Sequence, residues 1–248
     1  MPESKLYREK LYARYASAQV PDWLGEPSKS ARINRNGHAH RLLRWLPVAR
    51  NASILDLGCG SGELLTVLRS LGFNNLTGVG VGPEQVAIAR TRGHSVVQAD
   101  IVEYLRASDQ SFDMIFAFDV IEHFTKDEVL DLLDFIWRRL KPGGKLIVQT
   151  PNAMSPWGYY LRYNDLTHEL IFGPSCLAST LRLCGFKDMQ FREVTPYVHG
   201  IASAVRWILW KLVKVGLITL NCIESGEFYS GAYTRNMLVC ALKDQAAR

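Results

Sequence analysis

The hydrophobic positions of the chain form short apolar runs that alternate with segments of helical spacing. The first run, at residues 54–57, is typical of a strand buried on both faces, and a helical pattern starts at residue 63. Further strands are predicted at 75–79, 95–99, 112–118 and 145–149, and helices at 83–92 and 127–140, the last ended by Lys-Pro-Gly-Gly. Strands and helices that alternate at this spacing predict a parallel sheet with right-handed crossovers.

The last third of the chain adds a helix at 174–184 and strands at 187–194 and 236–242, with a longer apolar segment at 201–220 between those strands. Helical spacing in this segment separates a cationic arc from an aliphatic side. The arc contains Arg206, Trp207, Trp210, Lys211 and Lys214, and the aliphatic side contains Val205, Ile208, Leu209, Leu212 and Val215.

Two interpretations of residues 201–220 stay open. The three charges make the segment a poor membrane span, because each costs roughly 2.5–3.5 kcal/mol at the bilayer centre. Either the aliphatic side packs onto the domain or onto a second subunit, which makes a homodimer one outcome. Or the cationic, tryptophan-bearing edge touches a membrane or a lipid-linked glycan.

Composition narrows these expectations only slightly. The 248 residues suit one domain with appendages, and the net charge of +5 permits an anionic partner without requiring one. The five cysteines are odd in number and show no metal-ligand spacing, and the charged N-terminus shows no secretory signal. These features predict reduced thiols in a cytoplasmic protein, with membrane association through 201–220 as the alternative.

The first strand leads into a glycine-rich turn that reads Asp56-Leu-Gly-Cys-Gly-Ser-Gly62. Alternate glycines permit positive φ and let a ligand approach main-chain atoms, and Asp56 places a carboxylate where open α/β sheets bind ligands. The spacing differs from the dinucleotide-binding G-x-G-x-x-G, because the third glycine comes one residue early. The stretch resembles motif I of the class I S-adenosylmethionine-dependent methyltransferases, in which the turn accommodates the methionine part of the cofactor.

Other stretches extend the resemblance to the branch found in bacterial polysaccharide and O-antigen biosynthesis, over most of residues 50–200. They are Gly-Glu-Leu-Leu, Pro-Glu-Gln-Val, Asp-Val-Ile-Glu-His-Phe, Leu-Lys-Pro-Gly-Gly, Gln-Thr-Pro-Asn and Asp-Leu-Thr-His-Glu-Leu. The resemblance implies a Rossmann-like, doubly wound α/β fold whose seven-stranded sheet has the order 3-2-1-4-5-7-6, with strand seven antiparallel.

This fold divides the chain into four parts. They are a helical leader at 1–50, an S-adenosylmethionine-binding core at 51–194, a helical insertion at 195–235, and a final strand with a tail at 236–248. The leader is predicted from the helical spacing of Leu6, Tyr7, Leu11, Tyr12 and Tyr15, a loop at 21–27, and a second helix that ends at 41–45.

The resemblance also implies which residues hold S-adenosylmethionine. Asp56, Gly58 and Gly60 would contact its methionine end, Asp100 and Ile101 its adenine, and Phe118 the segment beneath the sulfonium, and Cys59, Gly80, Val81 and Asp119 complete the predicted cofactor set. Asp100 has a second interpretation, as the cap of the short helix that follows it.

One cofactor position departs from the family pattern. Relatives end the second strand with an acidic residue that accepts hydrogen bonds from both ribose hydroxyls, and here Gly80 stands in its place. A charge-assisted hydrogen bond contributes roughly 1.5–3 kcal/mol, so losing a bidentate one weakens cofactor binding by on the order of ten to a thousandfold. Gly80 therefore predicts one of three things: weak cofactor binding, another group that replaces the acid, or an enzyme whose activity is degraded or altered.

The resemblance predicts an enzyme that transfers a methyl group to a sugar or glycan hydroxyl, with a nucleotide- or lipid-linked acceptor as the partner. Two alternatives are a non-catalytic protein that keeps the fold, which Gly80 favours, and a small-molecule or quinone O-methyltransferase. A nucleic-acid partner is not expected. The chain has no cluster of basic residues interleaved with aromatics and no Asn-Pro-Pro-Tyr-type base-flipping motif.

Two histidines are the candidates for the proton acceptor. His123 follows the fourth strand, and His168 lies in a polar stretch in which Asp165 is predicted to orient its ring. On one helical turn, Asp119, Glu122 and His123 would share a face and could hold a divalent cation, as the similar quinone-pathway enzymes imply. In the other interpretation, Glu122 and His123 brace the helix and line the pocket without a metal.

Overall fold

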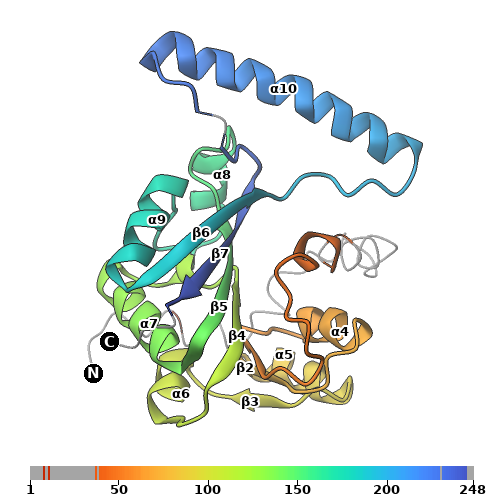
Figure 1. Cartoon of the computed structure of the whole chain (residues 1–248), viewed down its shortest axis with the longest axis vertical. Coiled ribbons are helices and arrows are strands. Elements are labelled where there is room, and N and C mark those ends of the chain that lie inside the picture. Colours follow the sequence, from red (N-terminus) through yellow and green to blue (C-terminus); the bar gives the residue numbers. More distant parts are fainter. Residues whose placement is uncertain (1–7, 9–10, 12–36, 38, 230, 245–248) are drawn as a thin grey trace.

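A seven-stranded sheet crosses the molecule in the computed structural model, which describes residues 8, 11, 37, 39–229 and 231–244 (Figure 1). The strands are β1 (Ile54–Leu57), β2 (Leu76–Gly80), β3 (Val96–Gln98), β4 (Phe112–Phe118), β5 (Leu140–Pro151), β6 (Phe186–Glu193) and β7 (Asn236–Lys243). Their order is β3-β2-β1-β4-β5-β7-β6, and β7 runs antiparallel to β5 and β6. The predicted order and the antiparallel last strand are both confirmed.

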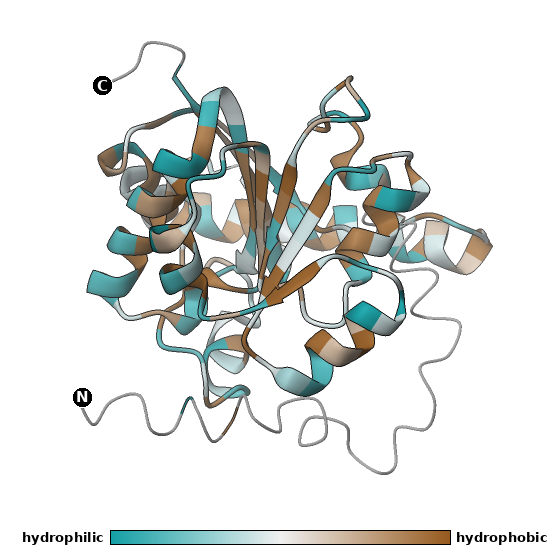
Figure 2. Ribbon diagram, turned by 90° about the horizontal axis from the view of Figure 1, so that it is seen from below, coloured by the Kyte–Doolittle hydropathy of each residue, from teal (hydrophilic) through white to brown (hydrophobic). Residues whose placement is uncertain are grey.

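Helices cover both faces of the sheet, as Figure 2 shows. They are α4 (Glu63–Ser70), α5 (Pro83–Thr91), α6 (Ile101–Ala107), α7 (Lys126–Arg139), α8 (Gly158–Tyr163), α9 (Pro174–Leu183) and α10 (Ile201–Ser225), with a short 3-10 helix, η2, at Ile121–His123. Pro83 occupies the first turn of α5, as its fixed φ favours. Thr125 and Glu128 form a capping box that starts α7.

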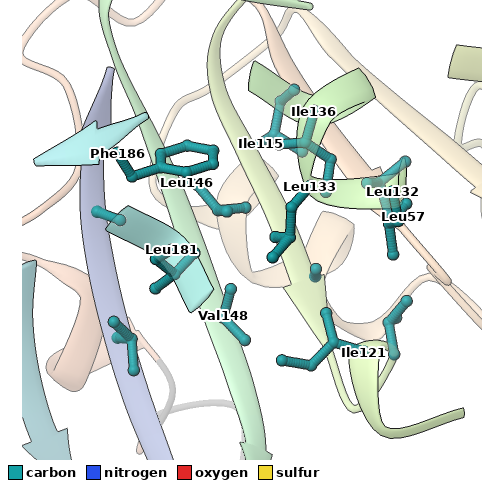
Figure 3. Close-up of a cluster of buried hydrophobic side chains, with 14 of the residues drawn as sticks. Leu57, Ile115, Ile121, Leu132, Leu133, Ile136, Leu146, Val148, Leu181 and Phe186 are labelled. Atoms are coloured by element: carbon teal, nitrogen blue, oxygen red, sulfur yellow. The ribbon is translucent and has the colours of Figure 1, made fainter. Parts of the chain in front are cut away.

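Two apolar clusters, one on each face, hold the helices to the sheet. Leu55 and Leu57 of β1 belong to one cluster, part of which Figure 3 shows, and Ile54 belongs to the other. Neighbouring residues of a strand point to opposite faces, so β1 is buried on both sides, as its continuous apolar run predicts. Each fully buried leucine of this kind contributes roughly 1.5–3 kcal/mol to folding.

The fifth strand begins earlier than the sequence pattern predicts. Lys-Pro-Gly-Gly follows the end of α7 at Arg139, as predicted, but β5 already begins at Leu140. The register with β4 shifts from Phe112↔Leu140 to Met114↔Lys145, so these residues form a bulge that keeps the strands paired. Within the leader, residues 39–42 are helical and a turn follows, which agrees with the predicted helix end, whereas most other leader predictions fall outside the described residues.

The insertion is helical, as predicted, but its orientation differs from the expected packing. The cationic arc of α10 faces the domain: Lys214 Nζ lies 3.0 Å from Glu193 Oε2, and these side chains are 17% and 12% exposed. The ring centroids of Trp210 and Trp157 are 6.3 Å apart. The aliphatic side points away from the domain, so the prediction that it packs onto the domain is wrong. Within the described ranges, no helix is long and apolar enough to cross a bilayer.

Candidate active site

The glycine-rich turn after β1 leaves main-chain atoms open at the carboxyl edge of the sheet. Gly58 and Gly60 have φ of 68° and 50°, a region that disfavours residues with a Cβ. A Cβ on Gly58 would lie 2.5 Å from Cγ2 of Val120, so this position also lacks space for a side chain. The turn thus forms a wall that a ligand can approach closely.

A cavity of about 270 Å³ lies against this wall. Of the predicted site residues, it is lined by Gly58, Gly60, Gly80, Val81, Asp100, Ile101, Asp119 and His123. Asp56 and Cys59 are buried, Phe118 is half-buried, and these three are not among the lining residues. Asp100 caps α6, because its Oδ1 accepts hydrogen bonds from the N–H groups of Val102 and Glu103, and its contact with adenine stays a prediction.

Sequence reasoning missed five lining residues: Arg8, Gly82, Gln85, Val120 and Phe124. Gln85 carried a usable signal, because a polar residue in the first turn of the helix after β2 sits at the ligand-binding edge of the sheet. A Cβ on Gly60 would lie 3.9 Å from Nε2 of Gln85, so this amide adjoins the glycine turn. Nothing in the sequence placed Arg8 here.

His123 and His168 lie together, with ring centroids 4.9 Å apart. Nδ1 of His168 is 2.8 Å from the carbonyl oxygen of Leu161. A carbonyl oxygen can only accept a hydrogen bond, so Nδ1 carries the proton and the neutral ring keeps Nε2 as its basic nitrogen. Leu161 therefore holds the ring of His168, and the predicted contact of this ring with Asp165 stays a prediction.

Asp165 acts on the other histidine. The Thr167 hydroxyl donates to Oδ1 of Asp165 at 2.6 Å, and its oxygen lies 2.8 Å from Nδ1 of His123. This chain of contacts holds the His123 ring. Burial and the neighbouring His168 lower the pKa of His123, while Thr167 and Asp165 oppose that shift. His123 is consequently neutral at neutral pH.

Two carboxyl groups lie near the histidines, Glu122 buried and Asp119 exposed in the cavity wall, and they do not share a helical turn as predicted. Asp119 has φ of 53° and precedes η2, and Nε2 of Gln149 donates to its Oδ2 at 2.9 Å. Desolvation of the Asp119 carboxyl raises its pKa to about 6. Glu122 is fully buried and accepts from the Thr150 hydroxyl at 3.0 Å, and burial together with Asp119 holds its pKa well above the ordinary value.

A family model described as a methyltransferase domain matches residues 30–190, well over half of the chain. The chain belongs to this family. It is a family of S-adenosylmethionine-dependent methyltransferases, and the class I resemblance read from the glycine turn is confirmed. Assignment to the polysaccharide branch stays a prediction.

Two relatives illustrate the range of the family. The methyltransferase is 37% identical over 107 residues to a ubiquinone biosynthesis O-methyltransferase of Xanthomonas oryzae pv. oryzae, a match over 41% of this chain and 44% of the relative. The chain thus matches less than half the length of that protein. It is 29% identical over 221 residues to a trans-aconitate 2-methyltransferase of Rhizobium rhizogenes, covering 82% and 83% of the two chains.

The fold also has solved counterparts. A SAM-dependent methyltransferase from Archaeoglobus fulgidus superimposes on the methyltransferase with a TM-score of 0.63 at 22% identity, covering 86% of this chain and 97% of that one. At this identity the likeness concerns the fold, which is the seven-stranded Rossmann-like architecture described above.

The buried carboxyl of Asp56 fits one end of the cofactor. Asp56 is 2% exposed, and its Oδ2 has no hydrogen-bond partner among the described residues. Burial raises its pKa to about 8, so the carboxyl is mostly protonated at neutral pH unless a positive charge comes near. S-adenosylmethionine carries an ammonium group, which is such a partner. The methyltransferase therefore has a suitable orphaned acid beneath its glycine turn.

Gly80 leaves space where relatives carry the ribose-binding acid. A Cβ at this position would lie 3.5 Å from Cγ2 of Val86 and 3.7 Å from Sγ of Cys59, which are ordinary van der Waals distances. Its φ is not in the left-handed region, so the backbone would accept a larger residue. The methyltransferase thus lacks only the acidic side chain at this position, and the backbone and the neighbouring residues leave room for one.

The possible ligands of a cation are not the predicted three. Ligand atoms of Glu122, His123 and His168 lie within 4.8 Å of one another, so His168 takes the place given to Asp119. Metal ligands must be deprotonated, and burial together with Asp119 raises the pKa of Glu122 well above its ordinary value, so a cation would have to compete with a proton for this carboxyl. The donor set of the methyltransferase therefore fits a divalent cation poorly.

Proposed function

We propose that the methyltransferase is an O-methyltransferase in which His168 removes the proton of an acceptor hydroxyl group. The observation that carries the proposal is the hydrogen bond from Nδ1 of His168 to the Leu161 carbonyl, which directs the basic Nε2 away from that partner. His123 stands beside it and lines the cavity, so the basic nitrogen belongs to a histidine pair at the cofactor cavity.

Methyl transfer requires few other functions of the protein. S-adenosylmethionine supplies an already activated methyl group. The protein has to align the acceptor oxygen with that methyl group and take up the hydroxyl proton, and Nε2 of His168 does the latter. His123 is neutral, and a neutral neighbour avoids the like-charge repulsion that a second imidazolium would impose on protonated His168.

The chain's own residues would hold the cofactor along the wall of the cavity. Gly58 and Gly60 let the methionine end approach the main chain above Asp56, and Asp100 and Ile101 border the adenine end. Gln85 lines the same cavity beside Gly60 and offers an amide as a substitute partner for the ribose hydroxyls. Two neutral hydrogen bonds from Gln85 would replace part of the lost affinity, about 0.5–1.5 kcal/mol each.

A cation-assisted route is the alternative for activating the hydroxyl. Glu122, His123 and His168 would be its ligands, but the raised pKa of Glu122 disfavours the deprotonated carboxylate that a metal ligand requires. We therefore assign proton removal to His168, and expect methyl transfer to survive treatment with EDTA. Loss of activity in EDTA that added Mg²⁺ restores would replace the His168 mechanism by the cation-assisted one.

Two classes of acceptor follow from the comparisons and the sequence motifs. The ubiquinone biosynthesis O-methyltransferase relative favours a phenolic hydroxyl group, and the resemblance to the polysaccharide branch favours a sugar hydroxyl group. We place the phenolic acceptor first, because that relative shares over a third of the matched residues.

One experiment separates the two acceptor classes. The protein is incubated with methyl-labelled S-adenosylmethionine and a panel of catechol-type quinone precursors, nucleotide sugars and glycan fragments. The proposal predicts label in a methyl ether, first on the phenols. Label on a sugar oxygen would be consistent with proton removal by His168 but would change the acceptor from a phenol to a sugar. Label only on nitrogen or carbon would contradict the proposal of an O-methyltransferase.

A further inference from the structure

The outer side of α10 is apolar along the whole helix. Its exposed side chains are Ile201, Val205, Ile208, Leu209, Leu212, Val215, Leu220 and Ile223. Leu212 and Ile223 are 65% and 77% exposed. A helix of 25 residues is about 37 Å long, so this outer face is a long apolar stripe, and Figure 1 shows the helix set apart from the layers of the domain.

The inner side of the same helix already has its partners. Ser203 is buried and donates to the carbonyl of Gly200, Trp210 lies near Trp157, and Lys214 pairs with Glu193. These contacts fix the rotation of α10 about its axis. The apolar stripe is therefore held outward by the domain's own contacts.

Basic side chains border the stripe. Helical spacing places Arg206 along one border and Lys211 along the other, and both are exposed. Glu224 is the only acidic residue of the helix, and it lies at the far end. The ammonium of Lys211 lies 5.1 Å from the centre of the Trp207 ring, and that ring is itself part-exposed.

We propose that the outer face of α10 binds the surface of an anionic phospholipid bilayer, with the helix parallel to that surface. The aliphatic side chains would enter the boundary between headgroups and acyl chains, and Arg206 and Lys211 would reach the lipid phosphates on either side. The contact is made by the aliphatic side with its basic borders, and not by the Trp210 and Lys214 edge, which the domain covers.

A second copy of the chain is the other occupant to consider, and charge disfavours it. Across a two-fold axis the patch meets itself, so both protomers would bring Arg206 and Lys211 to one interface. Glu224, at the far end of the helix, is the one acid of α10 that could pair with these two basic residues, so the paired faces would keep a net positive charge. Anionic lipids supply the missing negative charge.

The position of α10 gives this surface a role. The helix is inserted between the carboxyl end of β6 and the start of β7, and β7 starts opposite Pro151 at the carboxyl end of β5. The glycine turn follows the carboxyl end of β1, which runs parallel to β4 and hence to β5. A bilayer bound by α10 therefore lies toward the sheet edge that carries the cavity.

The test is cosedimentation of the full chain with vesicles at low salt. Wild-type protein is expected to bind vesicles of equal phosphatidylglycerol and phosphatidylcholine, and not vesicles of phosphatidylcholine alone. Each basic side chain near an anionic surface strengthens binding about fivefold, so the double change Arg206→Gln with Lys211→Gln is expected to weaken it about 25-fold. Leu212→Glu is expected to abolish binding.

Matched controls come from the C-terminal end of α9, just before the start of β6 and so at the amino edge of the sheet, away from the cavity. Arg182→Gln and Leu183→Glu change an exposed arginine and an exposed leucine there, and both variants are expected to bind as wild type does. Failure of the wild type to bind anionic vesicles would overturn the proposal, and so would undiminished binding by Leu212→Glu. A dimer that Leu212→Glu dissociates, without vesicle binding, would assign the face to a second copy instead.

Discussion

The imidazole rings of His123 and His168 lie 4.9 Å apart, and each ring is held by a different partner. Leu161 fixes His168, and Thr167 fixes His123. The two histidines are 45 residues apart in the chain and come from η2 and from the polar stretch after α8. Because the two rings lie together, the methyltransferase has a basic nitrogen, Nε2 of His168, beside its cofactor cavity.

Replacing His168 by alanine should lower the rate of methyl transfer at saturating substrates by about 10²–10⁴-fold, the usual contribution of a positioned base. The affinity for S-adenosylmethionine should stay the same, because His168 is not among the residues that line the cofactor cavity. His199→Ala, a change of an exposed histidine, serves as the control. Unchanged turnover in His168→Ala would eliminate this residue as the base.

The chain from Asp165 through Thr167 to His123 should be visible in the titration of His123. Burial lowers the pKa of this imidazole, and the carboxylate of Asp165 raises it, so Asp165→Asn should shift the pKa of His123 further down. NMR titration of the imidazole C–H signals measures both values directly. A wild-type value above 6.5, or an upward shift in the variant, would be inconsistent with the contacts described.

Gly80→Asp should tighten the binding of S-adenosylmethionine and S-adenosylhomocysteine alike, by about 10- to 1,000-fold, because both carry the same ribose. The geometry permits the change, since the new Cβ meets only ordinary contacts. Gly80→Asn is the matched control, with a similar shape and no charge, and it should gain much less. Equal affinities in all three proteins would show that the missing acid does not limit binding.

Asp56 should make the cofactor-free protein less stable as the pH rises. Its pKa is about 8 in the folded state against 3.8 for the ordinary carboxyl, so the folded state holds a proton that the unfolded chain has lost. The free energy of unfolding should therefore fall between about pH 4 and pH 8, and Asp56→Asn should reduce that slope. Urea unfolding at several pH values measures it, with the exposed Asp109→Asn as the control. The same slope in Asp56→Asn and wild type would contradict the raised pKa.

The sequence predicted the sheet well, because its signals are local. Buried strands are continuous apolar runs, and the glycines at 58 and 60 are required by the backbone conformation at those positions. The same kind of signal located the end of α7 at Lys-Pro-Gly-Gly, where Gly143 has φ of 74°. It did not reveal that β5 starts at Leu140, because that start depends on the pairing of Leu140 with Phe112 of β4.

The site was predicted only in part, because contacts between distant segments have no period in the sequence. The pattern placed Asp119, Glu122 and His123 on one helical turn, but the positive φ of Asp119 breaks that turn. It named both histidines, but it did not reveal that Asp165 reaches His123 through Thr167 or that Leu161 holds His168. For α10 the helical wheel gave the two sides correctly, and only the pairing of Lys214 with Glu193 decides which side faces inward.

The central claim is that the cavity against the glycine turn is where S-adenosylmethionine binds. Isothermal titration calorimetry tests it most directly, on wild type and on Val81→Trp, which places a large ring at an exposed position of the cavity wall, with Val48→Trp as an exposed control outside the cavity. We predict one-to-one binding by wild type and Val48→Trp, and at least tenfold weaker binding by Val81→Trp. No saturable binding by wild type, or wild-type affinity in Val81→Trp, would contradict the account.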